Sequence, residues 1–83
     1  MMPANESYIF TLKVRDAPGI LVRAAEIFGR RGANISQIHT THLPNPSLSQ
    51  MTITASNITR LDQITRQLEK LIDVQSVTVM SAS

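Results

Sequence analysis

A short segment at the predicted start of a helix has residue types that suit a small anionic ligand. It reads Asp16-Ala17-Pro18-Gly19-Ile20-Leu21. Pro18 has a backbone φ angle preset for a first helical position, and Gly19 lets a ligand approach the backbone closely. The N–H groups of Gly19, Ile20 and Leu21, together with the positive end of the helix dipole, suit a carboxylate. The simpler interpretation is a tight strand-to-helix turn without a ligand, since such turns are common.

Asn34 adds a second polar group to the ligand hypothesis. Its side-chain carbonyl accepts a hydrogen bond from an ammonium group, and its NH2 donates to a carboxylate. Asn34 begins a predicted strand. We expect it either beside the turn at the same end of the sheet or facing the turn across a dimer edge. The turn and Asn34 together predict a site for a small zwitterion.

The other polar residues indicate neither catalysis nor a metal site. His39 and His42 are three residues apart on a predicted strand and point to opposite faces, so we expect no shared metal. Arg30 and Arg31 suit a phosphate group, but cations at the negative end of a helix are the simpler explanation. No close carboxylate pair and no nucleophile beside a histidine base is evident. We therefore predict that the chain is not an enzyme.

Length and composition describe one small globular domain. The 83 residues are 42% hydrophobic and 17% charged and include no cysteine, which excludes a disulfide framework. A net charge of +2 with interspersed signs makes a weak field for nucleic acid. No apolar run approaches the roughly 20 residues that cross a bilayer, and no secretory signal is evident. We expect a cytoplasmic protein that binds neither nucleic acid nor membrane.

Hydrophobic periodicity divides the chain into four strands and two helices. Alternating residues predict strands, and apolar residues at a spacing of 3.6 predict helices. A glycine just after a helix, here Gly32, is typical of its C-terminal end. Ile35 and Ile38 fall on opposite faces of a regular strand, so we predict a bulge near Ser36. The predicted elements are strand 8–14, helix 18–31, strand 34–42, turn 44–47, strand 48–55, helix 57–72 and strand 74–80.

The order βαββαβ predicts an α+β, ferredoxin-like fold. Right-handed crossovers place both helices on one face of a four-stranded antiparallel sheet. We expect one domain over residues 8–80, with flexible tails at 1–7 and 81–83. The edge strand 34–42 carries two isoleucines and favours a homodimer through that edge. An RNA-binding domain shares this frame, but it needs aromatic residues on the exposed sheet face, where this chain has threonine, lysine and glutamine.

Four segments, residues 16–21, 27–35, 48–53 and 67–74, resemble the ACT domain of the small regulatory subunit of acetolactate (acetohydroxyacid) synthase. The first segment occurs in many ACT domains. The pattern Ser-x-Met-Thr-Ile over 49–53 and the pattern Gln-Leu-x-Lys-Leu-Ile-Asp-Val over 67–74 are more specific to this subfamily. The resemblance covers nearly all of residues 8–80.

The resemblance implies a non-catalytic subunit that activates a large catalytic subunit of acetolactate synthase and transmits feedback inhibition. It places a branched-chain amino acid, usually valine, between the loop before the first helix of one copy and the helix or the start of the second strand of its mate. Thiamine diphosphate, Mg²⁺ and usually FAD would belong to the catalytic partner, and this chain would hold no cofactor. By position, the implied effector-binding residues are Asp16, Gly19, Ile20 and Leu21 on the loop side, and Asn34 and Ile35 on the partner side.

Two features differ from the pattern of longer, valine-responsive members. Asp16 stands where those members usually have Asn. Its charge repels a ligand carboxylate but pairs with an ammonium group. Whether an effector binds therefore stays open. The chain also stops at Ser83 without a second domain, so it resembles the short type or a fragment. The alternative function is a stand-alone ACT sensor that binds an amino acid and regulates another protein.

Overall fold

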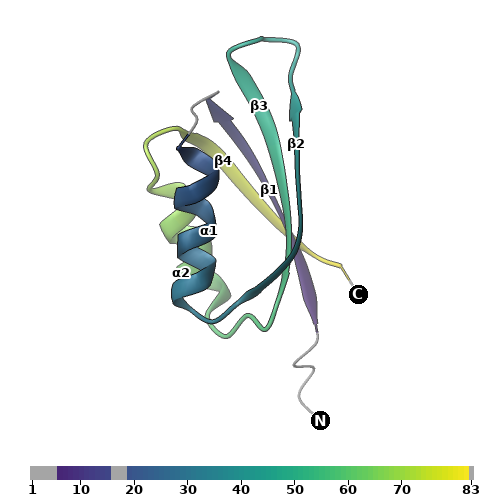
Figure 1. Ribbon diagram of the computed structural model, residues 1–83, viewed down its shortest axis with the longest axis vertical. Helices are drawn as coiled ribbons and strands as arrows, with labels where there is room; N and C mark the ends of the chain where they lie inside the picture. Colours follow the sequence, from purple (N-terminus) through teal and green to yellow (C-terminus); the bar gives the residue numbers. More distant parts are fainter. Residues whose placement is uncertain (1–5, 16–18, 83) are drawn as a thin grey trace.

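Alternating apolar residues build the sheet of this protein, and apolar stripes on two helices cover it. The computed structural model describes residues 6–15 and 19–82 (Figure 1). The elements follow the predicted order βαββαβ. Their bounds are β1 (Ser7–Arg15), α1 (Ile20–Arg30), β2 (Asn34–His42), β3 (Leu48–Ser56), α2 (Leu61–Glu69) and β4 (Val74–Ser81).

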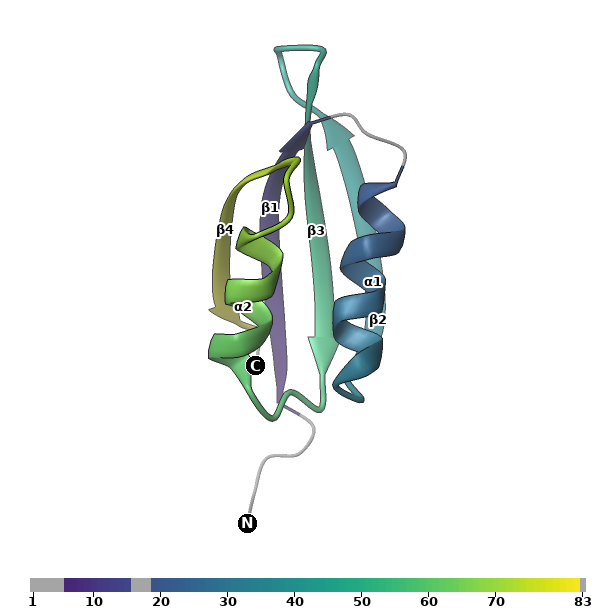
Figure 2. The same ribbon diagram turned by 90° about the vertical axis from the view of Figure 1, so that its left-hand side faces the viewer.

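The four strands form one antiparallel sheet in the order β2-β3-β1-β4. Both helices lie on the same face of this sheet, with α1 over the β2 side and α2 over the β4 side (Figure 2). The predicted ferredoxin-like fold class is therefore confirmed. Neither helix in residues 6–15 and 19–82 has the length and apolar content that crossing a membrane requires.

The predicted bulge in β2 is present at Ser36. The pairing of β2 with β3 shifts register between Ile35 and Gln37, and Ser36 Oγ donates a hydrogen bond to the Thr54 carbonyl at 3.2 Å. The extra residue places Ile35 and Ile38 on one face, because both now pair with buried residues of β3. The bulge thus gives β2 a single apolar face.

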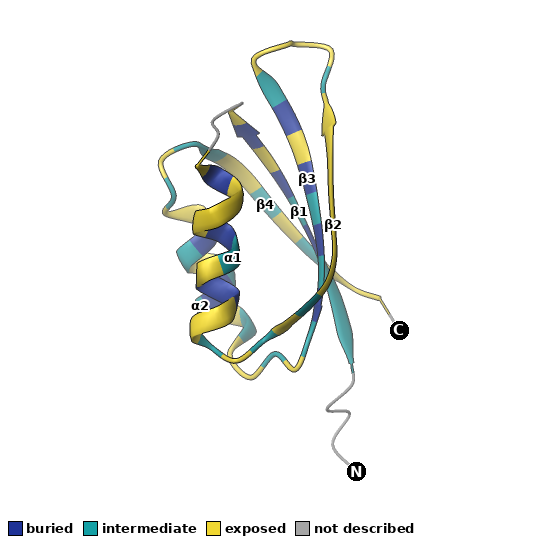
Figure 3. Ribbon diagram, in the orientation of Figure 1, coloured by how far each residue is buried: buried dark blue, intermediate teal, exposed yellow. Residues whose placement is uncertain are grey.

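The core lies between the sheet and the two helices (Figure 3). At its centre the rings of Phe10 and Phe28 meet edge to face, with centroids 5.0 Å apart, which is a favourable aromatic geometry. The open face of the sheet is mostly polar, as the alternation predicts, with Ile9 and Met80, paired across β1 and β4, as apolar exceptions. The buried core residues are Phe10, Leu12, Val14, Ile20, Ala24, Ile27, Phe28, Met51, Ile53, Ala55, Ile64 and Leu68.

The end of α1 has the glycine-based stop that the sequence predicts. Gly32 has a φ of 71°, in the left-handed region that glycine adopts readily. Its N–H donates to the Gly29 carbonyl at 3.1 Å, and the Ala33 N–H donates to the Phe28 carbonyl at 3.0 Å. This pair of bonds is a Schellman motif, which satisfies carbonyls that the helix leaves free.

The second helix is shorter than the predicted 57–72. Asn57 has a φ of 59° and donates its side-chain N–H to the Gly32 carbonyl at 2.9 Å, so it does not join α2. At the other end the helix gives way to turns after Glu69, and Ile72 is 87% exposed. The apolar periodicity therefore continued beyond the helix at both ends. The first helix also begins later than predicted, at Ile20, although residue 18 lies outside the described residues.

We predict opposite effects for alanine at the two glycines near the end of α1. Gly32→Ala puts a β-carbon into a left-handed conformation and should lower the free energy of unfolding by about 1 kcal/mol. Gly29→Ala is the matched control, since it lies in the helix and a β-carbon there meets no atom within 4 Å; it should raise stability by up to about 1 kcal/mol. Urea unfolding measures both. Equal effects would contradict the conformational explanation.

Candidate functional site

The turn before α1 leaves the first N–H groups of that helix without helical acceptors. Gly19 is the N-cap residue, and no side chain in the described part of the chain caps the helix. The first helical bond runs from the Arg23 N–H to the Gly19 carbonyl at 3.1 Å. The N–H groups of Ile20 and Leu21 therefore have no partner within the helix. Asp16, which the sequence predicts beside them, lies outside the described residues.

Arg23 brings a positive charge to this turn. A β-carbon placed on Gly19 would lie 3.9 Å from Cζ and Nε of Arg23 and 4.0 Å from Nη2. Helical side chains lean toward the N-terminus, so an arginine four residues after Gly19 reaches back to it. The guanidinium and the positive end of the helix dipole repel each other, and an anion between them would relieve that repulsion.

Sequence reasoning missed Arg23 as a site residue. The helical spacing places it on the outward face of α1, and it is indeed exposed. The signal that would have found it is its distance in sequence from Gly19, because residues four apart lie on the same helix face. The site at this turn therefore has a charged group besides the backbone.

The two apolar residues of the predicted loop side have different environments. Ile20 is 4% exposed and its side chain belongs to the core, so it offers the site only its backbone. Leu21 is 42% exposed, and its neighbour Val22 is 59% exposed. The apolar surface beside the turn thus comes from Leu21 and Val22.

Asn34 and Ile35 lie at the opposite end of the sheet from Gly19. Arg15 at the end of β1 pairs with Leu48, whereas Asn34 pairs with Ser56 at the far end of β3. Eight residues of strand separate these pairs, about 26 Å at the usual rise. Figure 1 shows the starts of α1 and β2 at opposite ends of the molecule. The prediction that Asn34 lies beside the turn within one chain is therefore wrong; the alternative across a dimer edge stays a prediction.

The edge strand β2 and the adjacent helix α1 both carry exposed apolar side chains. Among the strands of residues 6–15 and 19–82, β2 pairs with β3 alone, and α1 lies over the β2 side (Figure 2). Ile38 of β2 is 37% exposed on the helix face of the strand. An unpaired strand edge beside exposed Leu21, Val22 and Ile38 is a surface that favours association with another chain.

The two histidines face different sides of the sheet, as predicted. His39 pairs with Thr52 and His42 with the buried Ser49, whose Oγ lies 3.4 Å from His42 Nδ1. Across residues 6–15 and 19–82, no group of three histidine or acidic side chains is placed to hold a metal ion.

Comparison with known proteins finds relatives over most of the chain. The family described as AHAS small subunit-like ACT domain matches residues 10–76. A probable acetolactate synthase small subunit of Methanothermobacter thermautotrophicus is 44% identical over 73 residues, which are 87% of this chain and 44% of that protein. The acetolactate synthase small subunit of Mycobacterium leprae is 39% identical over 77 residues, 92% of this chain and 46% of that protein.

A solved structure agrees with the sequence matches. The acetolactate synthase small subunit of Thermotoga maritima is 32% identical, with a TM-score of 0.74 over 88% of this chain and 46% of that one. The chain thus spans less than half the length of these relatives.

We predict that Gly19→Asp stabilises the fold. An N-cap carboxylate accepts N–H bonds of the first turn, interacts favourably with the helix dipole and pairs with Arg23; together these should raise the free energy of unfolding by about 1 kcal/mol. Gly19→Asn is the matched control, with a similar shape and no charge. Thermal unfolding at low and high salt measures the difference, which salt should reduce. If the Asp variant is no more stable than the Asn variant, the turn does not attract negative charge.

Proposed function

Because the chain belongs to the family of AHAS small subunit-like ACT domains, we propose that it serves as a regulatory subunit of acetolactate synthase, or as the ACT domain of one. It is a member of the small-subunit family and not of the catalytic subunit. The observation that carries the proposal is the family match over residues 10–76, which runs from within β1 through α2 to the first residues of β4. In this role the chain binds the catalytic subunit in the cytoplasm and activates it for branched-chain amino acid biosynthesis.

The cofactors of the reaction belong to the catalytic subunit in this proposal. Thiamine diphosphate, Mg²⁺ and FAD would be held there, and this chain would contribute none of their ligands. Residues 8–80 would form the ACT domain. Its contribution is to bind an effector and to bias the catalytic subunit, by a coupling free energy of about 1–3 kcal/mol if it follows ordinary allostery.

The proposed effector is valine or another branched-chain amino acid. Its carboxylate would accept from the N–H groups at the start of α1 and pair with Arg23, which lies against Gly19. Its side chain would contact the exposed Leu21. Asp16 would pair with the ammonium group. These contacts form only the loop side of the proposed site. Asn34 of the same chain cannot complete it, because Asn34 lies at the far end of the sheet.

A second copy of the chain would supply the other half. If two copies pair antiparallel through their β2 edges, the mate's β2 runs in the opposite direction, and its start comes to the end where this chain has Gly19. Asn34 and Ile35 of the mate would then face the turn before α1. The exposed Ile38 of β2 supports the homodimer, since pairing of the two edges would bring the mate's strand beside it.

We expect this chain to raise acetolactate formation when it is added to the separately purified catalytic subunit. Rate measurements over a titration of the chain should saturate, and Gly19→Asp should activate like the wild type while losing any inhibition by valine. The control is the Gly32→Ala variant assayed below its unfolding temperature. No gain in rate, without co-purification with the catalytic subunit, would favour a stand-alone amino-acid sensor.

We expect isothermal titration to show that each site is shared between two chains. Wild type should bind valine, and Gly19→Asp should lose binding because its carboxylate takes the place of the ligand's. Asn34→Ala should also weaken binding. When equal amounts of the two variants are mixed and exchange freely, half of the dimers are heterodimers. Each heterodimer contains one site in which Gly19 and Asn34 are both intact, so about a quarter of all sites should recover wild-type binding. Recovery of no site would contradict a shared pocket.

A further inference from the structure

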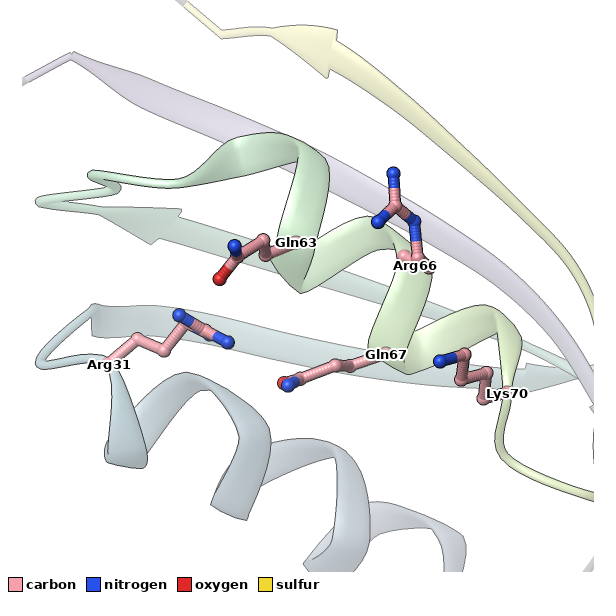
Figure 4. A pocket seen from close by; sticks show the side chains of 5 residues that line it. All are labelled: Arg31, Gln63, Arg66, Gln67 and Lys70. Carbon is pink, nitrogen blue, oxygen red and sulfur yellow. The ribbon is translucent and has the colours of Figure 1, made fainter.

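A hollow lies between the end of α1 and the side of α2 that faces it (Figure 4). Its volume is about 270 Å³, and it is far from the turn at Gly19, since Arg31 follows Gly19 by the length of α1, about 18 Å. Arg31 reaches from the end of α1 toward α2, while Gln63 and Gln67 extend from α2 toward it (Figure 4). The lining residues are Arg31, Gln63, Arg66, Gln67 and Lys70.

The hollow is lined by hydrogen-bond donors and cationic side chains; Arg31 and Lys70 point toward it, whereas the guanidinium of Arg66 points away (Figure 4). Three of its five lining side chains are cationic, two are amides, and none is a carboxylate. The ion pair found in the described part of the chain, between Arg60 Nε and Asp62 Oδ1 at 3.7 Å, lies outside the lining. Arg66 of α2 and Lys70, the C-cap residue of this helix, are four residues apart, where like charges repel. An anion in the hollow would offset this repulsion.

Arg31 gives an independent indication of a ligand. Its Nε is buried and has no hydrogen-bond partner among the described residues. A buried N–H without an acceptor costs free energy, so such a group calls for an explanation. A cation at the negative end of α1 explains a charge at this position, but it leaves the Nε–H unsatisfied. The adjacent Arg30 lies elsewhere, beside Glu26 and Gly29.

We propose that this hollow binds the phosphate group of a small molecule. A phosphate carries up to two negative charges and several acceptor oxygens, which match two cations, Arg31 and Lys70, and two amide NH2 groups better than the single charge of a carboxylate does. The Arg31 side chain would turn to bring Nε, which is closed to solvent in the unliganded chain, and Nη to the phosphate. Gln63 and Gln67 would donate through their amides, and Lys70 would add charge at the rim. The site is separate from the proposed effector site and does not depend on it.

NMR titration with inorganic phosphate, and then with pyrophosphate, tests this assignment in the absence of valine and of the catalytic subunit. At constant ionic strength, the Arg31 Nε–H and the side-chain amides of Gln63 and Gln67 should shift and saturate. Arg31→Gln should weaken binding about tenfold, as expected for a lost charge-assisted bond. Arg30→Gln is the matched control, with the same change of charge one residue away, and should bind within twofold of wild type.

Titration with acetate at the same ionic strength tests whether the hollow prefers a phosphate to a carboxylate. Saturation with phosphate but not with acetate supports the proposal, whereas equal titration curves for the two anions, or equal losses in Arg31→Gln and Arg30→Gln, would overturn it. If Arg31→Gln does not fold, Lys70→Gln replaces it, because Lys70 is exposed and outside the core; a wild-type affinity in that variant would count against the site.

Discussion

The packing of α1 against the sheet is the constraint on which the rest of the structure depends. Ile20, Ala24, Ile27 and Phe28 are buried on one side of this helix, and the Phe10–Phe28 contact fixes it over the sheet. Burial of Ile20 holds the first turn of α1 in place next to the end of β1. The N–H groups and Arg23 at that turn are thereby presented on a rigid element, which lowers the cost of ordering a ligand site.

The antiparallel sheet then determines what one chain can and cannot assemble. Because β2 starts at the end of the sheet where α1 finishes, its first residues are remote from the turn before α1. In an antiparallel partner the edge strand runs in the opposite direction. The first residues of the partner's β2 would therefore lie near the turn before α1 of this chain. A symmetric pair of chains would explain three features together: the incomplete ligand site, the free edge of β2 and the exposed apolar side chains of β2 and α1. An effector bound at the junction of the two chains would influence their relative position.

Much of this arrangement follows from local patterns in the sequence. The strand alternation, the glycine stop of α1 and the bulge at Ser36 were predicted because each depends on neighbouring residues: a face must be apolar, a left-handed residue must be glycine, and two isoleucines must share a side. The ends of α2 were predicted less well. The apolar period continues to Ile72, but Asn57 bonds to the Gly32 carbonyl, 25 residues away in sequence, and this contact is invisible to a local pattern.

The sequence by itself determined the order of elements, the core faces and the turn at Gly19, because backbone propensity and hydrophobic period act over a few residues. The tertiary structure decided which polar groups meet. It placed Ile20 in the core, separated Asn34 from Gly19, and brought Arg31 of one helix to Gln63 and Gln67 of the other. These outcomes depend on strand register and on how two helices pack across one sheet, which are set by the summed burial of distant residues and not by spacing along the chain.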